Sequence, residues 1–397
     1  MAEPWLTIIG IGEDGLAGLS EASRNALQRA ETVFGGERHL RLAGIDSRGR
    51  PWPVPFDAAC VLSRRGRPTA VLASGDPFWH GAGGSLAAQL ARDEWVAHPS
   101  PSTFSLAAAR LGWPLESTIC VGLHAAPFER LVPLLANGAQ IICLVRDAKA
   151  AGDLAAWLIA RGFGASRLWT LSALGGPREF MTESKAENYT AGSAVSPLAL
   201  AIEAAGDAGL PRASGLADDL FRHDGQITKR PVRALALSAL APRLSERLWD
   251  IGAGSGSISV EWALAGGSAI AVEAREDRAG NIRANAEAFG LTHRITVVAA
   301  SAPAALSSLE KPAAVFIGGG LDRRMSDTIW SLLPDGTRLV AHGVTLETEA
   351  LLADLQQRLG GDLMRIEISH AAPLGRLRSW EAAHPIVQWR VTKGSSA

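Results

Sequence analysis

Short and almost wholly apolar runs alternate with stretches of helical periodicity along the chain. In the first half such runs cover residues 5–9, 69–73 and 140–145, and in the second half they cover 248–251 and 313–317. An apolar run without alternation predicts a strand that is buried on both faces, as in a parallel sheet covered by helices. Because helical segments separate these strands, the pattern predicts an α/β fold.

The clearest motif of the chain joins one of these strands to a glycine-rich turn and a helix. The strand 248–251 leads into Gly-Ala-Gly-Ser-Gly at 252–256, and helical periodicity begins at Ile258. Glycines allow the backbone to approach a ligand closely, and Asp250 can accept hydrogen bonds just before them. The spacing is G-x-G-x-G, one residue short of the dinucleotide-binding fingerprint. A packing turn in an ordinary βαβ unit is the alternative interpretation.

A second predicted strand of this unit, residues 269–272, ends at Glu273. An acid at the tip of the second strand stands where a carboxylate binds the hydroxyls of a ribose. Together with the glycine turn, this arrangement resembles a class I S-adenosylmethionine (SAM) methyltransferase more closely than an NAD enzyme. The resemblance implies a Rossmann-like fold for the second half of the chain.

Glycine-rich loops also follow two strands of the first half. Residues 10–15 read Gly-Ile-Gly-Glu-Asp-Gly, which matches the dinucleotide fingerprint but has no helix starting at its third glycine. The strand 69–73 leads into the loop 74–84, which contains Asp-Pro and several glycines. Farther along, Ser102 and Thr103 form a turn that is typical of a helix N-cap.

Length, charge and cysteine usage narrow the class of protein. A chain of 397 residues predicts two domains, and the small, proline-containing segment 206–214 predicts the linker between domains 1–205 and 215–397. The formal net charge is −1, which argues against a nucleic-acid binder. The three cysteines form no metal-ligand cluster, and no signal peptide or membrane-spanning run is predicted. We therefore expect a cytoplasmic homo-oligomer without a metal and without a membrane partner.

The first domain resembles the class III methyltransferases that act on tetrapyrroles. The resemblance rests on Ile-Gly-Ile-Gly at 9–12, on Ser-Gly-Asp-Pro at 74–77 and on the Pro-x-x-Ser-Thr-Phe turn at 99–104. It implies a two-lobed α/β fold that holds a folded SAM in the cleft between its lobes. It also implies that the glycines at 10 and 12 line a substrate trough. Glu13 is a departure, because the family commonly has proline at that position.

The start of the second domain resembles a SAM-dependent domain that methylates and decarboxylates cobalamin precursors. In that family the threonine of Ile-Thr-Lys, here Thr228, folds over the cofactor. Related domains usually have an acid where Ser301 stands, which bonds the adenine amine. Residues 318–320 (Gly-Gly-Gly) follow the strand 313–317 and predict a wide, backbone-lined mouth for a flat substrate.

The order of the two resemblances implies a fused enzyme of cobalamin biosynthesis. Such an enzyme uses SAM in each domain and methylates two meso carbons of a tetrapyrrole. The resemblance assigns the methylation of C-5 to the first domain. It assigns the methylation of C-15 and the loss of carbon dioxide from the ring C acetate to the second domain. A SAM-binding regulatory protein with degenerate sites and an RNA methyltransferase with an accessory domain are the alternatives, although the neutral charge counts against the latter.

The motifs and the resemblances together give candidate residues for each site. Residues expected to contact SAM are Ser74, Gly75, Asp76, Trp79, Ser102 and Thr103 in the first domain, and Thr228, Asp250, Gly252, Ala253, Gly254, Ser255, Gly256, Glu273, Ser301 and Ala302 in the second. Residues expected to contact the substrate are Gly10, Gly12, Lys229, Arg233, Gly318, Gly319 and Arg376. No catalytic residue is assigned, because positioning a nucleophilic meso carbon can supply most of the acceleration.

Overall fold

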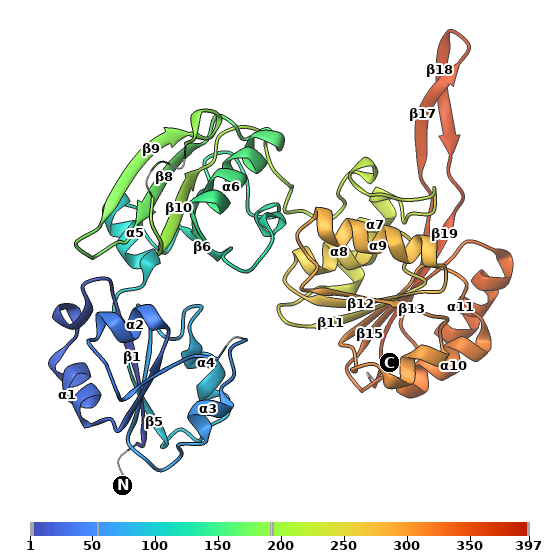
Figure 1. Cartoon of the computed structure of the whole chain (residues 1–397). Helices are drawn as coiled ribbons and strands as arrows, with labels where there is room; N and C mark the ends of the chain where they lie inside the picture. Colours follow the sequence, from blue (N-terminus) through green and yellow to red (C-terminus); the bar gives the residue numbers. More distant parts are fainter. Residues whose placement is uncertain (1–3, 54, 191, 193, 395–397) are drawn as a thin grey trace. The chain divides into compact units, whose positions relative to one another are not determined.

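The computed structural model describes residues 4–53, 55–190, 192 and 194–394 (Figure 1). The chain divides into two compact units. The first unit contains Met1–Phe128 and Leu134–Ala208, and the second contains Glu129–Pro133 and Gly209–Ala397. The main division thus falls between Ala208 and Gly209. None of the described helices is long and apolar enough to cross a membrane.

The first lobe of the first unit is built on a parallel sheet with the strand order β3-β2-β4-β1-β5. Its strands are β1 (Leu6–Ile11), β2 (Thr32–Gly35), β3 (Gly49–Pro51), β4 (Thr69–Ser74) and β5 (Trp95–His98). Its helices are α1 (Glu21–Arg29), α2 (Glu37–Leu42), α3 (Ala59–Leu62) and α4 (Ala82–Ala87), with a 3-10 turn η1 (Gly15–Gly18). Strand β1 therefore presents its carboxyl end between those of β4 and β5.

The second lobe is a mixed sheet with the strand order β6-β7-β10-β8-β9, in which only β6 and β7 run parallel. Its strands are β6 (Ile119–Gly122), β7 (Gln140–Val145), β8 (Arg167–Ser172), β9 (Phe180–Lys185) and β10 (Leu198–Glu203). Its other elements are α5 (Thr103–Leu111), α6 (Ala148–Ala160) and η3 (Ala186–Asn188). The 3-10 turn η2 (Phe128–Leu131) follows β6 in the chain, but its residues from Glu129 onward belong to the second unit. The apolar face of α5 packs on this sheet through Phe104 and Ala107.

One predicted helix of this region is wrong. The pattern between His124 and Leu135 predicts a helix, but the structure has only the 3-10 turn η2 there. Pro127 and Pro133 flank that turn. Proline disfavours a helical conformation at the residue before it, so Pro133 keeps the turn from lengthening toward Leu135, whereas Pro127 stands where the first turn of a helix tolerates proline.

The second unit is a seven-stranded sheet with the order β13-β12-β11-β14-β15-β19-β16. Its strands are β11 (Arg247–Ile251), β12 (Ser268–Glu273), β13 (Ile295–Ala299), β14 (Ala314–Ile317), β15 (Arg338–Gly343), β16 (Asp362–Ile366) and β19 (Ile386–Thr392). Its helices are α7 (Arg230–Leu240), α8 (Ser257–Leu264), α9 (Glu276–Ala288), α10 (Arg323–Leu332) and α11 (Leu346–Leu359), with the turns η4 (Asp218–Leu220) and η5 (Ala304–Ser308). The chain order reverses between β11 and β14, which is where ligands bind in sheets of this kind.

Helices cover both faces of this sheet (Figure 1). Residues of α7, α8 and α9 belong to one buried apolar cluster, whereas residues of α10 and α11 belong to another. Strand β11 serves both clusters, because Leu248 faces the first and Trp249 faces the second. A strand buried on both faces explains why residues 248–251 show no polar alternation.

The last strands of the main sheet follow the alternation of apolar and polar residues near the end of the chain. The alternating segments 363–369 and 386–391 predict two strands that pair with each other, and β16 pairs with β19 in antiparallel register. The sequence predicts no strand in the residues between these segments. Those residues form the hairpin β17 (Ser369–Leu374) and β18 (Leu377–Ala382), which projects from the sheet (Figure 1). Its two strands pair with each other and not with the main sheet, and nearly all of their residues are exposed.

Leu248→Ala is expected to lower the free energy of unfolding of the second unit by about 2–5 kcal/mol, because it removes a fully buried side chain and leaves a cavity. Leu346→Ala is the matched control, since the Leu346 side chain is 80% exposed at the start of α11. Scanning calorimetry of the full chain would measure both. Equal losses in the two variants would contradict the packing of β11.

Candidate cofactor and substrate sites

The glycine turn of the second unit is tied to the neighbouring strand. The N–H groups of Gly252 and Ala253 donate to Val272 O at 2.9 and 3.2 Å. The φ angles of Gly252, Gly254 and Gly256 are +67°, +59° and +71°, which is the left-handed region that side chains disfavour. The sequence therefore needs glycine at these three positions for the turn itself, and the helix α8 starts directly after it.

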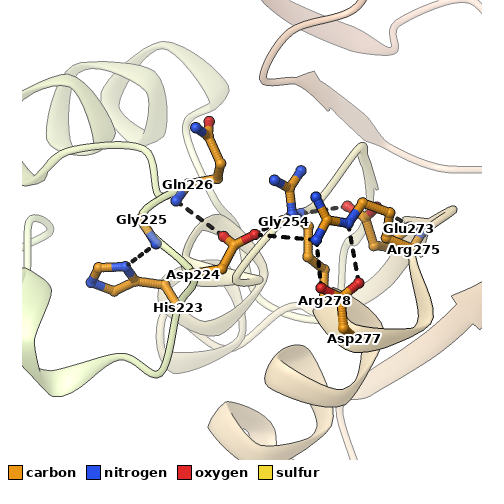
Figure 2. Close-up of polar contacts among 9 residues, drawn as sticks. All are labelled: His223, Asp224, Gly225, Gln226, Gly254, Glu273, Arg275, Asp277 and Arg278. Carbon is orange, nitrogen blue, oxygen red and sulfur yellow. Dashed lines mark hydrogen bonds and ion pairs between the residues drawn. The ribbon is translucent and has the colours of Figure 1, made fainter.

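Glu273 lies at the tip of β12 with its carboxylate beside this turn. Its Oε2 accepts from Gly254 N–H at 2.9 Å, and its Oε1 accepts from Arg275 N–H at 3.0 Å (Figure 2). Each carboxylate oxygen has a second lone pair, so both can still accept from the hydroxyls of a ribose. This is the position that the sequence predicts for a ribose-binding acid.

Asp250 lies beneath the turn rather than on its surface. Its side chain is buried, and Oδ2 accepts from Ser259 N–H at 3.1 Å and from Ser259 Oγ–H at 2.7 Å. Burial raises the pKa of Asp250 to about 6; the hydrogen bonds from Ser259 oppose this shift, and the nearby Glu273 adds to it. These bonds link β11 to α8, so Asp250 supports the turn from inside.

Ser255 supplies a polar atom that the protein itself leaves unused. Its hydroxyl is buried and has no hydrogen-bond partner among the described residues. Buried hydroxyls in native proteins are normally bonded, so this one fits a ligand that would lie on the turn. Gly256 beside it packs so closely on Ile282 of α9 that a side chain would have to displace Ile282.

A lead-in segment, residues 215–229, runs across the glycine turn before α7 begins. The carbonyl oxygen of Gln226 lies 3.5 Å from the position of a side chain built on Gly254. Asp224 anchors the segment, because its Oδ2 accepts from Arg278 Nε on α9 at 2.9 Å (Figure 2). Thr228 follows Gln226 by two residues within this segment and is half-buried.

Arg233 corrects one expectation of the sequence. It was expected at a pocket rim, but its side chain is fully buried in α7. Its Nε donates to Glu261 Oε1 at 2.6 Å, and its Nη1 donates to Asp218 Oδ1 at 3.0 Å and to Thr228 O at 2.5 Å. Glu261 also accepts from the N–H groups of Gly215 and Leu216. Arg233 and Glu261 therefore hold the lead-in segment in place from inside the unit.

The remaining candidates of the second unit flank the turn at neighbouring strand ends. Ala300 N–H donates to Glu273 O at 3.1 Å, which places Ser301 and Ala302 just beyond that contact. The carbonyl oxygen of Gly319 approaches Gly252 from the end of β14, after the partly buried Gly318.

Two basic candidates stand apart from these strand ends. Lys229 is exposed as the N-cap of α7. Arg376 lies in the turn of the β17–β18 hairpin, and no contact described in the structure joins it to the glycine turn.

Three loops of the first unit meet at the carboxyl end of β1. A side chain on Gly10 would collide with the carbonyl oxygen of Gly75. Ser100 joins the same place, because its Oγ–H donates to Gly10 O at 2.8 Å and its N–H donates to Gly75 O at 3.2 Å. Gly75 has a φ of +53° and packs against Pro101 and Ser102. The glycines expected at the substrate and at the cofactor are thus neighbours.

The aromatic and capping residues of this unit lie around the same loops. Ser102 caps α5, because its Oγ accepts from Ser105 N–H at 3.0 Å, and this confirms the predicted N-cap. Thr103 is the first residue of α5, and Trp79 packs on Phe104 with 4.8 Å between the ring centroids. Trp79 is 38% exposed, so one part of its ring is open to a ligand.

The loop after β4 completes this candidate set. Ser74 is exposed at the end of that strand, and Asp76 turns inward on its own loop by accepting from Phe78 N–H at 2.9 Å. Gly12 is partly buried in the loop after β1. Two arginines that the sequence did not indicate also reach this loop, since Arg38 and Arg178 both pair with Glu13.

Two protein families match successive parts of the chain. Residues 5–189 match the tetrapyrrole (corrin/porphyrin) methylases, and residues 219–393 match a precorrin methyltransferase domain. The fold and the glycine loops therefore belong to a methyltransferase with two such domains in succession.

A relative from a Sinorhizobium species, named precorrin-6Y C(5,15)-methyltransferase (decarboxylating), is 47% identical over 99% of this chain and 98% of its own length. The chain belongs to the family of these precorrin-6Y methyltransferases.

Two shorter relatives each match less than half of the chain. A probable cobalt-precorrin-6B C(15)-methyltransferase (decarboxylating) from Saccharolobus solfataricus is 37% identical over 37% of this chain and 77% of that protein. A cobalt-precorrin-7 C(5)-methyltransferase from Salmonella typhimurium is 30% identical over 40% of this chain and 80% of that protein.

Asp250→Asn is expected to flatten the pH dependence of the second unit's stability between about pH 4 and pH 6. The folded pKa of Asp250 is raised to about 6, whereas an unfolded aspartate titrates near about 3.9. Below the pKa of the unfolded state, Asp250 is protonated in both the folded and the unfolded chain, so its contribution to the free energy of unfolding is fully present there. It falls as the pH rises through the folded pKa, because the unfolded state loses its proton first.

Scanning calorimetry of both variants at several pH values would measure this effect. Asp335→Asn, which changes an exposed carboxylate, is the control. A slope that is the same in wild type and in Asp250→Asn would contradict a buried, protonated Asp250.

Proposed function

We propose that the chain is a bifunctional SAM-dependent methyltransferase of cobalamin (vitamin B12) biosynthesis. It methylates precorrin-6B, also called precorrin-6Y, at C-5 and C-15. It also removes the carboxyl group of the ring C acetate at C-12, and the product is precorrin-8. The observation that carries this function is the 47% identity to a decarboxylating precorrin-6Y methyltransferase over almost the whole chain.

We further propose a division of labour between the two domains. Residues 1–205 would methylate C-5, and residues 215–397, after the linker 206–214, would methylate C-15 and decarboxylate. The two shorter relatives support this division, because each carries the name of one activity and matches about two fifths of the chain. That the chain forms a cytoplasmic homo-oligomer stays a prediction, which size-exclusion chromatography and cell fractionation would check.

SAM is the methyl donor of this family, and one site per domain is part of the proposal. In the second domain the free lone pairs of Glu273 and the unpaired hydroxyl of Ser255 fit the ribose and the polar parts of such a ligand. In the first domain the backbone around Gly75 and the exposed part of the Trp79 ring suit the same ligand. When bound, SAM supplies an electrophilic methyl group on its sulfonium.

The protein contributes mainly position and partial exclusion of water. A meso carbon of a reduced tetrapyrrole is enamine-like, so the chain has to hold it in line with the methyl group, and such positioning is worth several orders of magnitude in rate. The triple-glycine end of β14 leaves room for a flat ring beside Gly252. For decarboxylation, the conjugated ring takes up the electrons of the broken C–C bond, and the domain has to orient and partly desolvate the carboxylate.

Glu273→Gln is expected to weaken SAM binding by the second domain about 10-fold to 100-fold, because it replaces charge-assisted hydrogen bonds to hydroxyls by neutral ones. Glu276→Gln on the same segment is the matched control, since the Glu276 side chain is 72% exposed and pairs with Arg283. Isothermal titration calorimetry would measure both. An unchanged affinity in Glu273→Gln would remove Glu273 from the cofactor site.

Anaerobic incubation with precorrin-6B and SAM, followed by mass spectrometry, tests the function. Wild type is expected to give a product that has gained two methyl groups and lost carbon dioxide. Gly10→Ala is expected to prevent the C-5 methylation, because the new side chain collides with Gly75 O. It is expected to leave the decarboxylation intact. Gly256→Ala, which crowds Ile282, is expected to prevent the decarboxylation and the other methylation.

Scanning calorimetry of each variant would confirm that the unsubstituted domain still unfolds as in wild type. A wild-type chain that binds SAM but leaves the substrate mass unchanged would instead support the regulatory alternative. If both variants lose the two methylations and the decarboxylation together, the result would contradict the division of labour.

A further inference from the structure

One carboxylate holds two arginines at the loop after β1. Arg178 Nη2 lies 3.0 Å from Glu13 Oε2, and Arg38 Nη1 pairs with the other oxygen, Glu13 Oε1. Glu13 is buried, with a side chain only 5% exposed. Arg178 belongs to the loop between β8 and β9, so this contact joins the two lobes of the first unit. Gly176 of the same loop packs directly on Glu13.

The cluster carries more positive than negative charge. Among the described ion pairs, Arg38 and Arg178 each pair with one acid, and that acid is Glu13 in both cases. Burial, then Arg178, then the exposed Arg41 lower the pKa of the Arg38 guanidinium below its usual value, which shows that other cations act on Arg38. Burial and Arg38 lower the pKa of His39 to about 4, so His39 is neutral near pH 7 and adds no further positive charge to the cluster.

The two arginines differ in the donors that they have left. Arg38 gives three described hydrogen bonds to the protein, because its Nη1 donates to Glu13 and its Nη2 donates to His39 Nε2 at 3.0 Å and to Ser74 Oγ at 2.8 Å. Arg178 gives only one described hydrogen bond, to Glu13, and its side chain is 57% exposed. A guanidinium has five N–H donors in a rigid fork, so Arg178 keeps an open edge for a planar acceptor.

The open edge of Arg178 lies beside the candidate site. Glu13 directly follows Gly12, and Arg38 reaches Ser74 at the end of β4, which precedes Gly75. The cluster therefore borders the loops where Gly10 and Gly75 meet. An excess positive charge with a free guanidinium edge fits a carboxylate, which accepts two parallel hydrogen bonds from arginine.

We infer that Arg178 binds one carboxylate of a tetrapyrrole substrate in the first domain, and that Glu13 and Arg38 are positioning residues that fix its side chain. The inference rests on the proposed function, since a precorrin carries several acetate and propionate carboxylates around its ring. It names a substrate contact at a residue that none of the sequence motifs indicated. The binding step breaks no covalent bond and transfers no proton.

Arg178→Gln tests this inference with a stable probe. The probe is uroporphyrin, a tetrapyrrole polycarboxylate, and its fully amidated derivative is the comparison ligand. Quenching of tryptophan fluorescence in the full chain would give both dissociation constants. Wild type is expected to prefer the carboxylate form, and Arg178→Gln is expected to weaken its binding about 10-fold to 100-fold while leaving the amide unchanged. Arg178→Lys is expected to lie between the two, because lysine keeps the charge but loses the fork.

Matched variants separate substrate binding from a merely structural role. Arg110→Gln breaks an ion pair with Glu179 on the same loop and removes one positive charge. Glu13→Gln releases Arg178 but leaves its charge. If Arg178 only joins the lobes, then Glu13→Gln and Arg178→Gln will weaken uroporphyrin binding equally, and this outcome overturns the inference. The inference is also overturned if Arg110→Gln weakens uroporphyrin binding as much as Arg178→Gln does. The same holds if wild type binds the amidated derivative as tightly as the carboxylate form.

The methylation assay keeps this inference distinct from the proposed function. With precorrin-6B, Arg178→Gln is expected to raise KM for the substrate about 10-fold and to leave the SAM affinity unchanged. A wild type that fails to methylate precorrin-6B, yet shows the Arg178-dependent preference for uroporphyrin, refutes the proposed substrate and leaves the carboxylate site standing. A wild type that methylates normally with no effect of Arg178→Gln on KM refutes the site alone.

Discussion

Close approach of backbone to backbone at the carboxyl ends of parallel strands is the constraint on which both candidate sites depend. In the first unit the loops after β1 and β4 touch, and a side chain at Gly10 has no room beside Gly75. In the second unit Gly252 and Ala253 donate hydrogen bonds to Val272 at the end of the next strand. Two sheets of different strand order thus arrive at the same solution, in which the absence of Cβ atoms leaves a surface of backbone groups for a ligand.

Buried charged residues have different roles in the two units. Arg233 and Glu261 are both inside the second unit, and their hydrogen bonds are taken up by Asp218, Thr228, Gly215 and Leu216. Such a pair needs every partner, because removing one leaves an uncompensated buried charge. It fixes the lead-in segment, which carries Thr228 toward the glycine turn. In the first unit Glu13 is buried, but the Arg178 that it orients stays open to solvent. An arginine–glutamate pair therefore fixes a segment of the chain in the second unit, whereas in the first unit such a pair holds an arginine that is exposed to solvent.

The chemistry that we propose does not require a nucleophile and base pair at either glycine loop. Methyl transfer to an activated carbon and decarboxylation into a conjugated ring both depend on orientation and solvent exclusion more than on proton transfer. The side chains at the second site serve that purpose. Asp250 supports the turn from below, and Glu273 and Ser255 offer acceptor and hydroxyl groups to a ligand. Under the proposed function, the two domains use one methyl donor and one substrate class with different sheets.

The sequence by itself determined the α/β class, the strands around the glycine turns, the position of Glu273 at the end of a strand beside the glycine turn and the N-cap Ser102. These features depend on local periodicity and on backbone conformations that only certain residues adopt. It could not place Arg233, since a charged residue at the start of a helix looks the same whether it faces solvent or a buried Glu261. Nor could it show that Glu13, Arg38 and Arg178 meet, because Arg38 reaches Glu13 only in the folded first lobe and Arg178 reaches it only when the second lobe packs on the first. Burial and long-range pairing are properties of the assembled chain, so tertiary structure alone decided which of its many arginines became structural and which stayed open to a ligand.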